Sequence, residues 1–116
     1  MATTLEILES QSGRLNLRVR GALDLAGVQA VELKLTAAAA RAGRHVVVDL
    51  SEVDQIASLG MGMLVSVSTA VSGKGFRLVL VLPSSAVLDA LRRARLDQVL
   101  SIVPDQAAAE AELDRT

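Results

Sequence analysis

Apolar and polar residues alternate with a period of two near the start of the chain. Residues 4–9 and 14–20 form two such segments, separated by a polar, glycine-containing stretch at residues 10–13. In the second segment the apolar positions are Leu15, Leu17 and Val19. Such alternation is typical of strands that bury one face, and the stretch between them is typical of a turn. We therefore expect an antiparallel hairpin at a sheet edge. Its second strand should expose one face to solvent and end at Gly21.

From residue 25 to about residue 42 the apolar spacing becomes that of a helix. Its apolar positions are Leu25, Val28, Val31, Leu35 and Ala38. These positions keep one face of a helix apolar, and the alanine run at residues 37–40 has high helix propensity. Asp24 stands where an N-cap belongs, and Gly43 is a typical stop. We expect a helix between these two residues.

The segment from residue 45 to residue 72 holds the strongest signals. Its valine run, residues 46–48, predicts a strand buried on both faces. From Leu59 onward the apolar spacing is helical, at Met63, Leu64, Val67, Ala70 and Val71. The polar residues between these elements indicate a loop that contains Asp54. Ser58 falls at the junction with the helix, where an N-cap is expected.

The remaining segments continue the alternation of strands and helices. Residues 76–82 predict another buried strand, and Ser84 or Ser85 caps a helix that extends to about residue 93. A short strand at residues 99–103 and a helix at residues 106–113 follow. Alternation implies parallel crossovers. We predict one α/β domain over residues 1–116, with a mixed sheet of four to five strands, an antiparallel first pair and about four covering helices.

Composition excludes several classes of function. Phe76 is the only residue among Phe, Trp and Tyr, so the chain has no platform for stacking bases or sugars. The net charge of −1 gives no footprint for nucleic acid. We interpret the basic cluster Arg92, Arg93 and Arg95 as a solvated helix C-terminus. Residues 1–20 do not resemble a signal peptide, and no apolar run is long enough to span a membrane, so we expect a cytoplasmic protein.

The residue types in this chain give little support for catalysis or metal binding. The chain has no cysteine and one histidine, His45, so nucleophile–histidine pairs and zinc sites are not expected. Asp24, Asp49 and Asp54 could together bind Mg²⁺, but aspartate is favoured at caps and turns for local reasons. We therefore predict no enzyme activity, no metal and no cofactor.

Ser58 and the two glycines after it allow two interpretations. A helix start carries free backbone N–H groups, so an anion at Ser58 would be stabilised there. Gly60 and Gly62 would let a phosphate or a partner surface approach closely. In the alternative interpretation Ser58 is only a cap, and the glycines only permit tight packing of the helix on the sheet.

Two short motifs carry a family resemblance. Asp49, Leu50 and Ser51, followed by Gly60, Met61 and Gly62, resemble the D-L-S and G-L-G parts of the central signature of STAS domains, the family of bacterial anti-sigma factor antagonists. Upstream, the run Gly21, Ala22, Leu23 and Asp24 resembles the G-E-L-D turn of the same family. The order and separation of these motifs extend the resemblance over nearly the whole chain.

The resemblance implies a regulator that binds a serine-kinase-type anti-sigma factor. The residues implied to bind this partner are Asp24, Asp54, Ser58, Leu59, Gly60, Met61 and Gly62. Regulated members of the family are phosphorylated on the Ser or Thr immediately before the first glycine, and that position here is Leu59, which leaves Ser58 as the candidate acceptor. We expect Ser58 to be mainly a structural cap. The alternative is a STAS subunit of a membrane transport complex or signalling scaffold, docked constitutively.

Overall fold

The computed structural model describes residues 2–8, 13–83 and 85–115. Within these residues the chain forms strands, α-helices and a short 3₁₀ helix, η1. In chain order the elements are β1 (Thr4–Leu8), β2 (Leu15–Leu23), α1 (Leu25–Arg41), β3 (Val46–Ile56), α2 (Ser58–Ser72), β4 (Leu78–Val81), α3 (Ala86–Arg93), η1 (Leu96–Gln98), β5 (Ser101–Val103) and α4 (Gln106–Asp114). Most of the expected turn at residues 10–13, and the alternative cap Ser84, lie outside the described residues.

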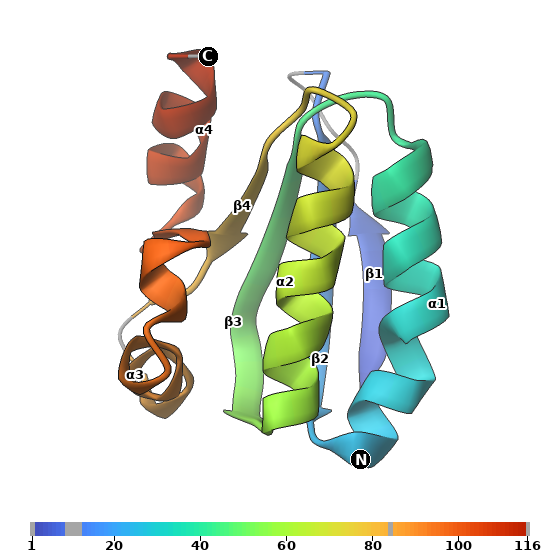
Figure 1. Cartoon of the computed structure of the whole chain (residues 1–116), viewed down its shortest axis with the longest axis vertical. Helices are drawn as coiled ribbons and strands as arrows, with labels where there is room; N and C mark the ends of the chain where they lie inside the picture. Colours follow the sequence, from blue (N-terminus) through green and yellow to red (C-terminus); the bar gives the residue numbers. More distant parts are fainter. Residues whose placement is uncertain (1, 9–12, 84, 116) are drawn as a thin grey trace.

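The strands form one mixed sheet in the order β1-β2-β3-β4-β5. β1 runs antiparallel to β2, and all later neighbours are parallel. The predicted α/β fold with an antiparallel first pair is confirmed. α1 and α2 lie side by side against one face of the sheet (Figure 1), and α3 joins the same hydrophobic core. α4 packs on the other face, over β3 and β4.

β3 lies at the centre of the sheet, between β2 and β4. The side chains of Val46, Val47 and Val48 are all 0% exposed. Val46 and Val48 face the main core beneath α1 and α2, whereas Val47 faces the smaller core beneath α4. Burial on both faces, which the valine run predicted, is therefore confirmed.

β3 continues to Ile56, so the prediction of a loop after Leu50 is wrong. Residues 51–56 remain paired with β2 through two register shifts, and at each shift β3 contributes one residue more than β2. Bulges of this kind strengthen the twist of a strand and re-aim its side chains. Asp54, expected in a loop, is consequently an exposed residue of β3.

β2 also runs past its expected end. Gly21 has a φ of 102°, which glycine adopts without strain, and it stays paired with Val53 of β3. Gly21 therefore bends the strand instead of ending it. The face of β2 that was expected to be exposed to solvent is only partly exposed, because Asn16 is buried and accepts a hydrogen bond from Gln106 of α4.

α1 begins and ends as the sequence predicted. Asp24 is its N-cap and accepts a hydrogen bond from the backbone N–H of Gly27 at 2.8 Å, and Gly43 follows the helix with a φ of 60°. The buried positions of α1 are Gly27, Val28, Val31, Leu35 and Ala39. Leu25 was expected on this face but is 60% exposed, because Gly27 fills the inward position of the first turn.

The last third of the chain follows the prediction with one addition. Ser85 is the N-cap of α3 and accepts from the backbone N–H of Leu88 at 3.2 Å. The strand expected at residues 99–103 is shortened to β5, because η1 and Val99 at its C-cap occupy the preceding residues. None of the helices in the described ranges is long and apolar enough to cross a membrane.

Charged side chains pair on the face of the sheet opposite α1 and α2. Arg18 Nε lies 3.2 Å from Asp49 Oδ2, and Arg20 Nε lies 2.9 Å from Glu52 Oε2. Arg20 also lies 3.2 Å from Glu6 of β1. We call these five residues the charge ladder. Opposite charges on neighbouring strands stabilise a sheet modestly, and exposed pairs contribute at most about 1 kcal/mol each.

Asp49 should give the folded state a measurable pH dependence. Burial raises the pKa of Asp49, but hydrogen bonds from Ser51 and the pairing with Arg18 together outweigh burial and hold the pKa below the ordinary value of 3.8. A carboxyl group whose pKa is lower in the folded than in the unfolded protein stabilises the fold above its unfolded pKa, and this contribution is lost as the pH falls through the folded pKa. Urea unfolding should therefore show stability falling more steeply below about pH 4 in the wild type than in Asp49→Asn. Asp54→Asn removes one charge outside the charge ladder and controls for net charge. Equal slopes for the wild type and Asp49→Asn would contradict this role.

Candidate functional site

The first turns of α1 and α2 meet at the carboxyl end of the parallel strands. Figure 1 shows both helices beginning at the same end of the molecule, where β2 and β3 finish. The backbone N–H of Ala57, just before α2, donates to the carbonyl oxygen of Leu23 at the end of β2, at 3.0 Å. This end of an open parallel sheet is where binding sites usually form.

Asp24 connects the two helix starts. Its Oδ1 caps α1, as described above, and its Oδ2 lies 3.5 Å from the Nε2 of Gln55 near the end of β3. One carboxylate therefore orders the start of α1 and contacts the strand that leads into α2. The cap function that the sequence assigned to Asp24 is confirmed.

Glycine occupies the third position of both helices, and both glycines are buried. A Cβ atom on Gly27 would lie 1.8 Å from the carbonyl oxygen of Ala22, and one on Gly60 would lie 2.7 Å from that of Leu23. Real Cβ atoms do not approach oxygen this closely, so each helix rests directly on the backbone at the end of β2. The interpretation of Gly60 as a packing residue is thus supported by geometry.

Gly62 has a different environment from Gly60. It is exposed, and a Cβ atom there would have no neighbour within 4 Å. None of the described neighbours requires glycine at this position. Among the two glycines of the signature, Gly62 alone leaves open space in front of the helix.

Ser58 is not the N-cap of α2, so the cap expected there is wrong. The N-cap is Ala57, with extended φ and ψ of −98° and 170°, and it makes no side-chain cap hydrogen bond. β3 runs on to Ile56, which places the last extended residue one position before the serine. Ser58 is the first helical residue and is exposed, and its hydroxyl makes no hydrogen bond in the described part of the chain.

Leucines are exposed at both helix starts. Leu59 is 48% exposed at the second position of α2, and Leu25 is 60% exposed at the first position of α1. Met61 is half-buried against the main core. We call Asp24, Leu25, Ser58, Leu59 and Gly62 the helix-start surface. The helical spacing predicts Leu25 in the core, and the structure places it at the surface instead.

A repeated pattern could have revealed this pairing. Each helix follows an extended N-cap and has glycine as its third residue, in the runs Asp24-Leu-Ala-Gly27 and Ala57-Ser-Leu-Gly60. The repeat indicates that both first turns meet a backbone at close range. Only the second run was noted from the sequence.

The three aspartates considered for Mg²⁺ do not converge. Asp24 caps α1, Asp49 pairs with Arg18 in the charge ladder, and Asp54 is exposed at the second bulge of β3. Among the described residues, no three His, Cys, Asp or Glu side chains are grouped so that they could hold a metal ion.

The two signature glycines should respond oppositely to alanine. Gly60→Ala forces a Cβ atom against the Leu23 carbonyl and should destabilise the protein by about 1–3 kcal/mol, as overpacking does. Gly62→Ala fills open space in a helix and should stabilise it by about 0.5–1 kcal/mol. Urea unfolding of the two variants and the wild type measures both changes. A Gly60→Ala protein as stable as Gly62→Ala would show that the close contact is not a constraint.

Comparisons with known proteins identify a matching family and solved structures with the same fold. The family model described as "Mlab, STAS domain" matches residues 7–104. No curated protein matches the chain. An anti-sigma factor antagonist from Mycobacterium paratuberculosis has a similar structure, with a TM-score of 0.82, 21% identity, and coverage of 96% of this chain and 95% of that chain.

Two further solved structures have the same fold. A candidate anti-sigma factor antagonist from Thermotoga maritima has a TM-score of 0.82 at 19% identity, covering 97% of this chain and 94% of that chain. The Bacillus cell fate determinant SpoIIAA, in its phosphorylated form, has a TM-score of 0.65 at 17% identity, covering 95% and 98%. At these identities the likeness shows the fold. The family model spans most of the sequence, and the chain belongs to the STAS domain family.

Proposed function

We propose that this chain is a regulator like the anti-sigma factor antagonists, and that it binds a serine-kinase-type anti-sigma factor through the helix-start surface. The observation that supports this most directly is the exposure of Leu59 and Leu25 beside Asp24, at the starts of two packed helices. Similar structures include proteins described as anti-sigma factor antagonists. Such a regulator acts by binding, without catalysis, and we expect it in the cytoplasm.

The physical character of the surface suits a protein partner. Leu25 and Leu59 offer apolar area that water solvates poorly, and the Asp24 carboxylate beside them adds charge. Interfaces commonly place apolar residues at the centre and polar residues at the rim. The exposed carboxylate of Asp54 in β3 would extend the polar rim. Gly60 is buried, so we assign it to the support of this surface and Gly62 to close approach by the partner.

Leu59 sets this chain apart from phosphoregulated members of the family. By resemblance it occupies the acceptor position, and leucine has no hydroxyl group. Ser58 is exposed and its hydroxyl is not engaged in a cap, so the structural role first expected for it does not hold. Successive helix residues point about 100° apart, because a turn has 3.6 residues. A kinase aligned with the side chain at the second position of α2 would have to turn by this angle to reach Ser58, and we propose that docking is not controlled by the usual phosphorylation.

A second candidate follows from the same apolar surface. A STAS subunit of a membrane transport complex or of a signalling scaffold would dock permanently, and two exposed leucines, one of them at the family's acceptor position, suit a permanent contact. The two candidates differ in the partner and share the docking surface. Binding measurements with defined partners separate them.

Charge placed on the helix-start surface should weaken partner binding. Leu59→Arg and Leu25→Arg should each reduce affinity about tenfold or more, as truncation or disruption of a central interface residue does. The measurement is calorimetric titration with each purified serine-kinase-type anti-sigma factor encoded in the same genome. Leu33→Arg is the matched control, because Leu33 is 85% exposed on α1 and lies outside the surface.

The binding experiment has clear contrary outcomes. Equal losses in Leu59→Arg and Leu33→Arg, or no loss in either surface variant, would place the interface elsewhere. If the wild type binds no anti-sigma factor but binds a purified transport or scaffold subunit in a Leu59-dependent way, the second candidate replaces the first.

Leu59 should also prevent phosphorylation. After incubation with the anti-sigma factor kinase and ATP, intact mass should show no added phosphate on the wild type. Leu59→Ser restores a hydroxyl at the acceptor position and should gain one phosphate, which also shows that the kinase is active. A phosphate on the wild-type chain that maps to Ser58 and abolishes binding would overturn the proposal and establish a displaced switch.

A further inference from the structure

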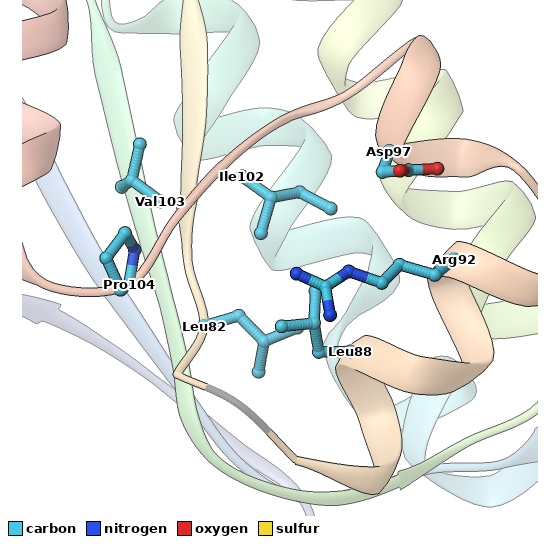
Figure 2. Close-up of a pocket in the computed structure, with 7 residues that line it drawn as sticks. All are labelled: Leu82, Leu88, Arg92, Asp97, Ile102, Val103 and Pro104. Carbon is cyan, nitrogen blue, oxygen red and sulfur yellow. The ribbon is translucent and has the colours of Figure 1, made fainter.

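A cavity of about 450 Å³ opens between α3, η1 and the carboxyl ends of β4 and β5. Figure 2 shows the residues that line it. They come from α3, η1, β5 and the residues that directly follow β4 and β5, and are Leu82, Leu88, Arg92, Asp97, Ile102, Val103 and Pro104. The volume is in the range of small-molecule sites, and none of the lining residues belongs to the helix-start surface.

Five of the seven residues that line the cavity are apolar, although polar atoms form nearly half of its exposed wall. Leu82 follows β4 directly, Ile102 lies in β5, and Leu88 lies on the inner side of α3. The backbone N–H of Leu82 donates to the carbonyl oxygen of Val103 at 2.9 Å, which fixes the floor between the two strands. Arg95, with a left-handed φ of 60°, turns the chain from α3 into η1, which carries Asp97 at the rim of the cavity, and the cavity is open to solvent on one side.

Arg92 supplies a positive charge to the cavity. It lies one helical turn after Leu88, on the same side of α3. Figure 2 shows its guanidinium group reaching toward Leu82 and Ile102, whereas the carboxylate of Asp97 turns away from it. Within the described residues Arg92 forms no ion pair, although other arginines of the chain do. Arg92 is exposed in the last turn of α3, as the interpretation of a solvated helix end expected, and its side chain also lines the cavity.

We propose that this cavity binds a monocarboxylate with an unbranched or compact apolar body, such as a short- or medium-chain carboxylic acid. A guanidinium group presents paired N–H donors that match the two oxygens of a carboxylate. The leucine, isoleucine, valine and proline walls would cover the apolar body and remove it from water. An inorganic anion would gain only the first of these contributions, and a neutral alcohol only the second. The proposal does not rest on the function assigned to the helix-start surface.

Octanoate is the probe that tests this site. Titration of the full chain should shift the methyl resonances of Leu82, Leu88 and Ile102, and octanoate should bind about tenfold or more tightly than octanol or inorganic phosphate. Arg92→Gln should remove this preference for octanoate over octanol. Arg93→Gln is the matched control, because Arg93 is the next residue of α3 and does not line the cavity.

The outcomes decide the proposal in either direction. Equal affinity for octanoate and octanol in the wild type, or an equal effect of Arg92→Gln and Arg93→Gln, would overturn it. Methyl shifts confined to residues outside the cavity would overturn it as well. Both variants change exposed side chains, and matching urea midpoints confirm that each is folded.

Discussion

The contact of two helix starts with the end of β2 constrains the rest of this molecule. Gly27 and Gly60 lie so close to the carbonyl groups of Ala22 and Leu23 that no side chain fits between helix and strand. Because backbone meets backbone at both places, α1 and α2 are held at fixed depth and side by side. The leucines that precede the glycines, Leu25 and Leu59, are left exposed by this packing and form part of the helix-start surface.

The sequence predicted those parts of the fold in which one period dominates. The valine run of β3 and the helical spacing from Met63 to Val71 have single interpretations, and both were confirmed. Residues 51–56 were read as a loop because their polar side chains and two bulges hide the alternation of a strand. That misreading shifted the start of α2 by one residue and produced the wrong cap at Ser58.

The candidate site was only partly readable for a similar reason. Asp24 was found because a cap depends on a local hydrogen bond within three residues. The spacing of Leu25 fits the buried stripe and so predicts a core position. Only the tertiary contact at Gly27 shows that Gly27 faces inward and that Leu25 faces outward. The cavity beside Arg92 is formed by segments from Leu82 to Pro104 that meet only after folding, so no local pattern announces it.

The charge ladder has a consequence for how the sheet assembles. Side chains in a strand alternate between faces, so pairing β2 with β3 one residue out of step would exchange the two faces of β2. Arg18 and Arg20 would then enter the core now filled by Leu17 and Val19, at a desolvation cost of several kcal/mol for each charge. Pairs that add little to the correct fold thereby make misaligned folds unfavourable. The charge ladder therefore selects the correct alignment of β2 with β3. Equilibrium stability measurements on single ion-pair variants would not reveal this property.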